Sequence, residues 1–176
     1  MSVSSPGSSS TGRKVYVLDA TGIFAGLPLQ APGPFYTTPG VVGEVRDENS
    51  KRVLENSLSL GRLTVMSPSS RFLEEARRVA SEVGVEVSLS STDVEVLALA
   101  LELAASGLDV TVVTDDYMLQ NASAHAGLGY MPVKTRGIRG TRRYEVYCPA
   151  CGYRPRGEAP RICPRCGHRL SRRLRA

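Results

Sequence analysis

All four cysteines of the sequence lie in its last thirty residues, in two C-P-x-C-G segments. Two C-x-x-C pairs at this spacing are typical of a structural zinc site, in which four thiolates surround one ion tetrahedrally. Disulfide bonds are the alternative, which the lack of a recognisable signal peptide disfavours. The segment has few apolar residues, so zinc would have to supply about 10 kcal/mol or more of its folding free energy. We predict one structural Zn²⁺ bound by Cys148, Cys151, Cys163 and Cys166.

Four acidic residues from distant parts of the chain could form a second metal site. Asp19 and Asp115 each follow a short apolar run, and Glu44 and Asp93 each lie in the first turns of an expected helix. Ligands of open parallel sheets bind outside the carboxyl ends of the strands, so we expect these carboxylates to converge there. Without cations they would repel one another. The cluster therefore predicts one or two catalytic Mg²⁺ or Mn²⁺ ions, which prefer carboxylate oxygen.

Side chains beside these acids could assist them. Asp116 is an alternative or auxiliary ligand next to Asp115, and the hydroxyl groups of Thr21 and Thr114 could orient a ligand or a water molecule. Each acid also has a structural explanation, such as favouring a helix start or ending a strand. Asp109 precedes its strand, at the opposite end, and we expect it to be structural.

Alternating strand and helix patterns predict the scaffold that positions the acids. The expected strands are Lys14–Leu18, Leu63–Met66, Val110–Val113 and Tyr130–Lys134. The expected helices follow Thr38, Ser69 and either Ser91 or Thr92, and the last two end at Gly84 and Gly107. We expect Asp47 and Glu48, one turn beyond Glu44, and His125, in a short helix, to be surface or packing residues. The alternation predicts an α/β fold with a parallel sheet flanked by helices.

Composition divides the chain into segments. We expect a disordered, Ser-rich and Gly-rich leader at 1–12, followed by the α/β domain at 13–133. A flexible basic linker at 134–143, a zinc ribbon at 144–170 and a basic tail at 171–176 complete the chain. No apolar run approaches the ~20 residues of a membrane span, so we expect a cytoplasmic protein without a membrane partner.

The positive charge of the chain is concentrated at one end. From Lys134 onward there are thirteen Lys and Arg against two acids, a formal charge of +11, whereas the first 133 residues carry −6. Such asymmetry indicates a nucleic-acid partner, and Arg is suited both to phosphate contact and to stacking on unpaired bases. A merely solvated basic tail is the alternative. The bases that we expect to contact RNA are Lys134, Arg136, Arg139, Arg142, Arg143, Arg154, Arg156, Arg161, Arg165 and Arg169.

Four segments of the chain resemble the acidic motifs of the PIN-domain ribonucleases. In order, they are VYVLDATGIFAG, TTPGVVGEVRD, SSTDVEVLALALEL and VVTDDYMLQNAS. Their combination with a C-terminal C-P-x-C-G ribbon resembles the Nob family of ribosome-assembly endonucleases, in its short archaeal form. The resemblance covers nearly all of residues 14–169.

The resemblance implies an activity that spacing alone does not give. It implies a divalent-metal endonuclease with an active site of Asp19, Glu44, Asp93 and Asp115, and it leaves open whether Asp115 or Asp116 takes the fourth role. The implied substrate is precursor small-subunit (16S) rRNA within the pre-ribosomal small subunit, which the enzyme trims to its mature 3′ end. The ribbon would help to hold this RNA, and a KH-domain assembly factor is a further partner implied by the family.

Two other functions remain open at this point. One is a toxin-type PIN ribonuclease, with the same chemistry and another RNA target. The other is a non-catalytic RNA-binding assembly factor in which the PIN fold is a scaffold. Loss of an acid would favour the second, and the sequence retains all four.

Overall fold

A computed structural model describes residues 12–135, 137–138, 140–156 and 159–175 of the chain. Residues 1–11 of the expected leader lie outside the described residues, as do Arg136 and Arg139, two of the expected RNA contacts. Within the described residues, no helix is both long and apolar enough to cross a membrane.

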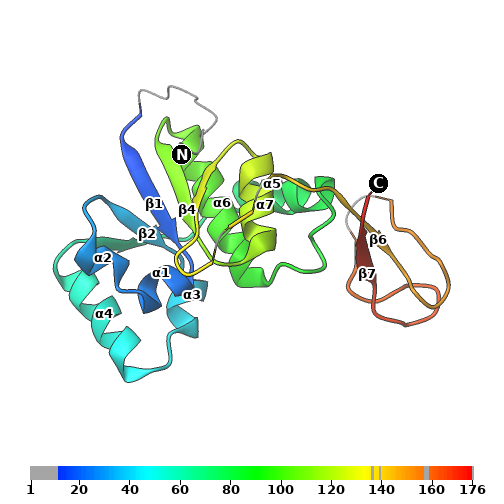
Figure 1. The fold of residues 1–176 in the computed structure, drawn as a ribbon, viewed down its shortest axis with the longest axis horizontal. Helices are drawn as coiled ribbons and strands as arrows, with labels where there is room; N and C mark the ends of the chain where they lie inside the picture. Colours follow the sequence, from blue (N-terminus) through cyan, green and yellow to red (C-terminus); the bar gives the residue numbers. More distant parts are fainter. Residues whose placement is uncertain (1–11, 136, 139, 157–158, 176) are drawn as a thin grey trace.

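A five-stranded parallel sheet forms the centre of the larger domain (Figure 1). Its strands are β1 (Lys14–Leu18), β2 (Phe35–Thr37), β3 (Leu63–Val65), β4 (Asp109–Val113) and β5 (Gly129–Met131). They lie in the order β3-β2-β1-β4-β5, and Leu18 pairs with Val113 at the carboxyl end of the two central strands. The prediction of an α/β fold with a parallel sheet is confirmed.

Helices cover the sheet and form the core with it. They are α1 (Ala20–Phe24), α2 (Leu27–Gln30), α3 (Pro39–Glu44), α4 (Glu48–Ser59), α5 (Ser70–Glu82), α6 (Ser91–Ala105) and α7 (Tyr117–His125). Figure 1 shows α1–α4 gathered on one side of β1 and β4, and α5–α7 on the other. Helix α6 is apolar over most of its length, and Val96 to Ala100 are all fully buried. Its position in the core is the reason for this composition, since a helix that is hydrophobic all round is a buried one.

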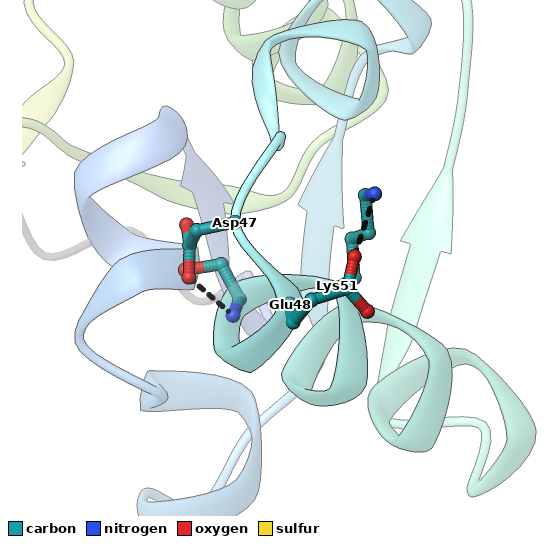
Figure 2. Close-up of polar contacts among 4 residues, drawn as sticks. Asp47, Glu48 and Lys51 are labelled. Carbon is teal, nitrogen blue, oxygen red and sulfur yellow. Dashed lines mark hydrogen bonds and ion pairs between the residues drawn. The ribbon is translucent and has the colours of Figure 1, made fainter.

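The segment between Thr38 and Leu63 differs from the expectation of one helix. Helix α3 ends at Glu44 because Val45 takes an extended conformation, and α4 then starts from Asp47. The Asp47 carboxylate accepts a hydrogen bond from the amide of Ser50 at 2.9 Å, and Glu48 pairs with Lys51 at 3.1 Å (Figure 2). Asp47 and Glu48 are exposed, as expected. Their role is to start a second helix.

The sequence patterns also missed strand β2 and misplaced one helix start. Strand β2 has only three residues, between Pro34 and the cap of α3, which is too short to show an alternating pattern. Helix α6 starts one or two residues earlier than expected, because Ser90 and not Ser91 or Thr92 is its N-cap. The expected strand at Leu63–Met66 ends at Val65, and the expected strand at Tyr130–Lys134 is Gly129–Met131.

The cysteine-rich end forms a separate two-stranded antiparallel sheet, β6 (Tyr144–Tyr147) and β7 (Ser171–Leu174). It lies at one end of the molecule (Figure 1). Tyr144 pairs with Leu174, and Tyr147 pairs with Ser171. Residues 171–174, expected in the basic tail, are therefore a strand of the ribbon. The Arg-rich composition hid this strand, because the sequence SRRL shows no alternation of apolar and polar residues.

Hydrogen bonds to backbone carbonyl groups join the ribbon to the larger domain. The amide of Tyr144 donates to the carbonyl oxygen of Val83 at 2.7 Å, and the Arg161 guanidinium donates to the carbonyl oxygen of Leu89 at 3.1 Å. Gly84 lies so close to Tyr144 that an added Cβ would be 2.0 Å from its carbonyl oxygen, so only glycine fits there. The ribbon is thus docked on the segment that follows α5.

Candidate active site and cysteine cluster

The carboxyl ends of β1 and β4 meet where the strand order of the sheet reverses. From β1 the chain continues to β2 on one side, and β4 lies on the other. Such a switch point leaves a crevice at the carboxyl edge, which is where open α/β sheets bind ligands. Asp19 directly follows β1, and Thr114, Asp115 and Asp116 directly follow β4. Asp109 lies at the opposite end of β4, away from this crevice.

Asp19 is held in place by the first turn of α1. Its carboxylate accepts hydrogen bonds from the amide of Thr21 at 2.7 Å and from the Thr21 hydroxyl. Burial raises the pKa of Asp19, although hydrogen bonds from the hydroxyl groups of Thr114 and Thr21 oppose the shift. A partly buried carboxylate whose charge is incompletely compensated is suited to a cation.

Glu44 and Asp116 lie close enough to Asp93 for their charges to act on its carboxylate. Burial raises the pKa of Asp93, and the neighbouring carboxylates of Asp116 and Glu44 raise it further. The Asp93 carboxylate accepts from the amide and the hydroxyl of Ser90, both at 2.8 Å, which fixes its position at the start of α6. Three acids from α3, α6 and the start of α7 therefore face one region.

Asp115 points to a different part of the structure. Its carboxylate accepts hydrogen bonds from the amides of Val133, Lys134 and Thr135 at 2.9, 3.0 and 3.1 Å. Burial acts to raise the pKa of Asp115, but these three amides outweigh it and lower the pKa. Asp115 thus fixes the start of the basic linker to the end of β4.

Asp116 occupies the start of α7 and is exposed. Its carboxylate accepts from the amides of Met118 at 2.6 Å and Leu119 at 3.0 Å, and its own amide donates to the Thr114 hydroxyl at 3.0 Å. Buried Thr114 thus contacts Asp116 and, through its hydroxyl, Asp19. One threonine links the acids that follow β1 and β4.

Two residues that position the acids had no clear signal in the sequence. Ser90 both caps α6 and holds Asp93, as one half of a capping box. Glu95, one turn further along α6, accepts from the amide of Gly40 at 3.1 Å and so ties α3, which carries Glu44, to α6. A Cβ added at Gly40 would be 2.5 Å from the Glu95 carboxylate, so a larger residue there would displace the Glu95 side chain from this hydrogen bond.

Two side chains of α7 form hydrogen bonds with the backbone of the linker between the two domains. The Gln120 side chain accepts from the amide of Ile138 at 3.0 Å and donates to the carbonyl oxygen of Thr114 at 2.8 Å. The Asn121 side chain pairs with both backbone groups of Arg142. His125, at the end of α7, lies 3.0 Å from Glu82 at the end of α5.

The four cysteines form a compact cluster with two matching halves. Their sulfur atoms all lie within 4.8 Å of one another, and the closest pairs are Cys148–Cys166 at 3.5 Å and Cys151–Cys163 at 3.6 Å. A tetrahedral zinc site with bonds of about 2.3 Å places its sulfurs about 3.8 Å apart, whereas a disulfide needs about 2.05 Å. Within the described ranges this is the one group of three or more His, Cys, Asp or Glu residues compact enough to hold a metal by direct contact alone.

Each half of the cluster is a tight turn whose backbone N–H groups favour thiolates. The amide of Gly152 donates to the carbonyl oxygen of Cys148 and that of Gly167 to Cys163, both at 2.9 Å, and both glycines have φ of +71°. Burial opposes ionisation of Cys148, but the amides of Cys151 and Ala150 lower its pKa to about 6. The amide of His168 favours the Cys166 thiolate, but the sulfurs of Cys148 and Cys151 raise its pKa to about 12. The cluster therefore needs a cation to hold four negative sulfurs together.

The basic side chains of the ribbon are mostly exposed. Arg154 lies 3.4 Å from Glu145, which also pairs with Arg173, and Arg165 lies over the ring of Tyr153 at 5.1 Å. Arg154, Arg156 and Arg165 line one depression of about 490 Å³. Lys134, Arg142, Arg143, Arg161 and Arg169 are exposed as well.

A comparison with protein families identifies the class of protein to which the larger domain belongs. Residues 16–103, which include Asp19, Glu44 and Asp93, match the family described as PIN domain of ribonuclease. The parallel five-stranded sheet flanked by helices is consistent with this class.

Individual relatives of similar sequence identify the family within this class. The chain is 38% identical to Endoribonuclease Nob1 of Pyrococcus abyssi over 152 residues, 86% of this chain and 88% of the relative. It is 36% identical to Endoribonuclease Nob1 of Methanothermobacter thermautotrophicus over 158 residues, 89% of this chain and 91% of the relative. It is also 48% identical to Ribonuclease VapC3 of Aeropyrum pernix over 134 residues, 76% of this chain and 96% of the relative. The chain belongs to the Nob family of PIN-domain endoribonucleases, and it is a ribonuclease.

Proposed function

We propose that this protein is a divalent-metal-dependent endoribonuclease that cleaves precursor 16S rRNA in the cytoplasm to form its mature 3′ end. The partner is then the pre-ribosomal small subunit, together with a KH-domain assembly factor. The observation that carries the proposal is the grouping of Asp19, Glu44, Asp93 and Asp116 at the switch point of the sheet, in a chain that also carries a four-cysteine ribbon. Several relatives of similar length bear the name Endoribonuclease Nob1.

We assign the fourth metal-binding position to Asp116 and give Asp115 a supporting role. The Asp115 carboxylate is bonded to the linker, whereas Asp116 lies close enough to Asp93 to raise the pKa of Asp93. Thr114 and Thr21 hold Asp19, and Ser90 holds Asp93. The carboxylates would hold one or two Mg²⁺ or Mn²⁺ ions, partly through water molecules, since Mg²⁺ keeps several waters when it binds.

The reaction is hydrolysis of one phosphodiester bond. The carboxylates of Asp19, Glu44, Asp93 and Asp116 would hold a divalent ion, which when bound would supply a more acidic water and compensate charge on the phosphate. The water oxygen bonds to phosphorus as the bond to the 3′ oxygen breaks, and the 3′ oxygen takes a proton from solvent. The products are a 3′-hydroxyl and a 5′-phosphate. The acids orient the reacting groups and carry no base preference, so the choice of site depends on the contacts that position the strand.

The identity of 48% to Ribonuclease VapC3 favours a second candidate, a toxin-type PIN ribonuclease with another RNA target. A non-catalytic assembly factor is the third, and the retention of all the acids argues against it. The Nob assignment is the better supported, because three relatives named Nob1 are 35–38% identical over 86–89% of this chain. The relatives named VapC match either over less of the chain, 76%, or at a lower identity, 29%.

A substrate competition separates these candidates. The protein is incubated with Mn²⁺ and an equimolar mixture of a 16S precursor fragment and unrelated structured transcripts, including tRNA. We expect the precursor to be cut at least about tenfold faster, which corresponds to 1.4 kcal/mol of preference. Preferred cleavage of another transcript would identify the toxin-type reading, and no cleavage of any transcript would identify the non-catalytic one.

A further inference from the structure

A basic groove lies where the ribbon meets the larger domain. It has a volume of about 450 Å³, and its basic side chains are Arg161, Arg169 and Arg172 of the ribbon. The larger domain contributes Ser88 and Ser90. No acidic side chain is among the described residues that line it. Three guanidinium groups beside two hydroxyl groups suit a phosphate group, which accepts hydrogen bonds from both.

Arg172, one of the residues that line the groove, has a buried donor without a hydrogen-bond partner among the described residues. Its guanidinium lies 5.0 Å from the centre of the Tyr144 ring, yet the Nη1 atom is buried without a hydrogen-bond partner in the described structure. A buried charged donor without a hydrogen-bond partner destabilises the folded protein. This destabilisation is relieved when a bound ligand accepts a hydrogen bond from the donor. A phosphate oxygen is the ligand that matches its charge and its geometry.

The groove adjoins the acid cluster. Ser90 lines the groove, and its amide and hydroxyl both donate to the Asp93 carboxylate at 2.8 Å. The other side of the groove is fixed by the ribbon, because Arg161 donates to the carbonyl oxygen of Leu89 next to Ser90. Docking of the ribbon therefore places its arginines beside the residue that holds Asp93.

We propose that this groove binds one backbone phosphate of a single-stranded RNA segment, within a few nucleotides of the bond that is cleaved. This inference rests on the proposed function. It assigns the ribbon a local role in presenting the strand to the acids, in addition to general attraction of RNA. Phosphate contacts fix the register of a strand without reading its sequence. Such a contact would hold the bond that is cleaved in place beside the acids.

The test uses full-length, zinc-loaded protein with Asp19→Asn, so that binding is measured without cleavage. The probe is a short single-stranded RNA that spans the 3′ end of 16S rRNA. Arg169→Gln and Arg172→Gln should each weaken binding about tenfold or more, the effect of losing a charge-assisted hydrogen bond. Arg175→Gln is the matched control, since it removes the same charge from an exposed residue of the ribbon that does not line the groove. It should weaken binding less than about threefold.

A variant in the larger domain tests the groove without changing the ribbon. Ser88 is exposed and belongs to the larger domain. Ser88→Glu places a negative charge in the groove and should weaken binding to the same RNA about as much as Arg169→Gln. Zinc content and thermal unfolding should match those of the parent protein.

A scan with single methylphosphonate linkages, which carry no charge, locates the phosphate. For the parent protein, one linkage near the cleaved bond should reduce affinity when neutralised. In the Arg172→Gln protein, neutralising that linkage should cause no further loss of affinity. In the Arg175→Gln protein, it should reduce affinity as much as in the parent protein. If the groove variants behave like Arg175→Gln and no linkage couples to them, the groove is not a phosphate site, although wild-type cleavage would leave the proposed function intact. If the wild type neither binds nor cuts this RNA, both proposals are wrong.

Discussion

Asp115 and Asp116 are neighbours in the sequence, but their carboxylates bond to different parts of the structure. Asp115 accepts from three successive amides of the linker, beginning with Val133 at 2.9 Å, whereas Asp116 accepts from the first amides of α7 and lies near Asp93. The doubled acid thus combines a structural anchor with a member of the acid cluster.

Substitution of Asp116 and of Asp115 should have different effects on the rate of cleavage. Asp116→Asn should reduce cleavage by about 100-fold or more, since even residues that support metal ligands cost 10- to 100-fold. The helix should remain, because Asn is as good an N-cap as Asp. Asp115→Asn should keep most of the activity and speed hydrogen exchange at 133–135. Rates of cleavage measured side by side decide the assignment, and it fails if Asp115→Asn is the inactive variant.

Removing a buried charge should stabilise the protein in the absence of Mg²⁺ and Mn²⁺. Burial raises the folded-state pKa of Asp19 and Asp93 above the ordinary value of 3.8. A raised pKa means that the folded protein binds the proton more tightly, so stability falls as the pH rises from about 4 through the folded-state pKa. Asp19→Asn and Asp93→Asn avoid this loss.

At pH 7 each variant should therefore melt a few degrees above the wild type, a rise that corresponds to about 1 kcal/mol. The difference should shrink as the pH approaches 4.5, and added Mn²⁺ should stabilise the wild type but not these two variants. Asp109→Asn, at the other end of β4, serves as the control: it should melt like the wild type without metal and gain the same stability from Mn²⁺. Variants that melt below the wild type at pH 7 without metal would argue against charge crowding at this edge.

The crevice could be predicted from the sequence, but the direction of each side chain could not. Apolar runs placed Asp19 and Asp115 at strand ends, because strand ends follow from local composition. The orientation of Asp115 depends on the amides of 133–135, which only the tertiary fold brings near. Arg172 was missed for a similar reason: strand β7 is defined by pairing with β6, and its sequence SRRL resembles a solvated tail.

The cysteine cluster should hold about one zinc ion per chain, and it should keep this ion when mild chelation removes Mg²⁺ or Mn²⁺. Cys148→Ser should lose the zinc and unfold the ribbon, because metal binding supplies its folding free energy. Elemental analysis measures the first result, and hydrogen exchange at 144–175 measures the second. Titration that finds no free or zinc-bound thiol would instead indicate disulfides.

The ribbon should give RNA binding its dependence on salt. Each phosphate contact releases counterions, so affinity for single-stranded RNA falls with a logarithmic slope of about −0.7 per contact. A chain that ends after Tyr144 retains every buried residue of the main core and should stay folded. It should bind structured rRNA more weakly, with a smaller slope, and still cut short unstructured RNA at high concentration. Equal slopes for the two chains would mean that the ribbon serves a protein partner.

The acids at the ends of β1 and β4 are proposed to cut precursor rRNA at its mature 3′ end. The most direct measurement maps the 3′ ends that form when a 16S transcript extended beyond its mature 3′ end is incubated with the protein and Mn²⁺. We predict one new 3′-hydroxyl, at the mature end, for the wild type and none for Asp19→Asn. Cleavage scattered along the transcript, or equal cleavage by Asp19→Asn, would contradict the account.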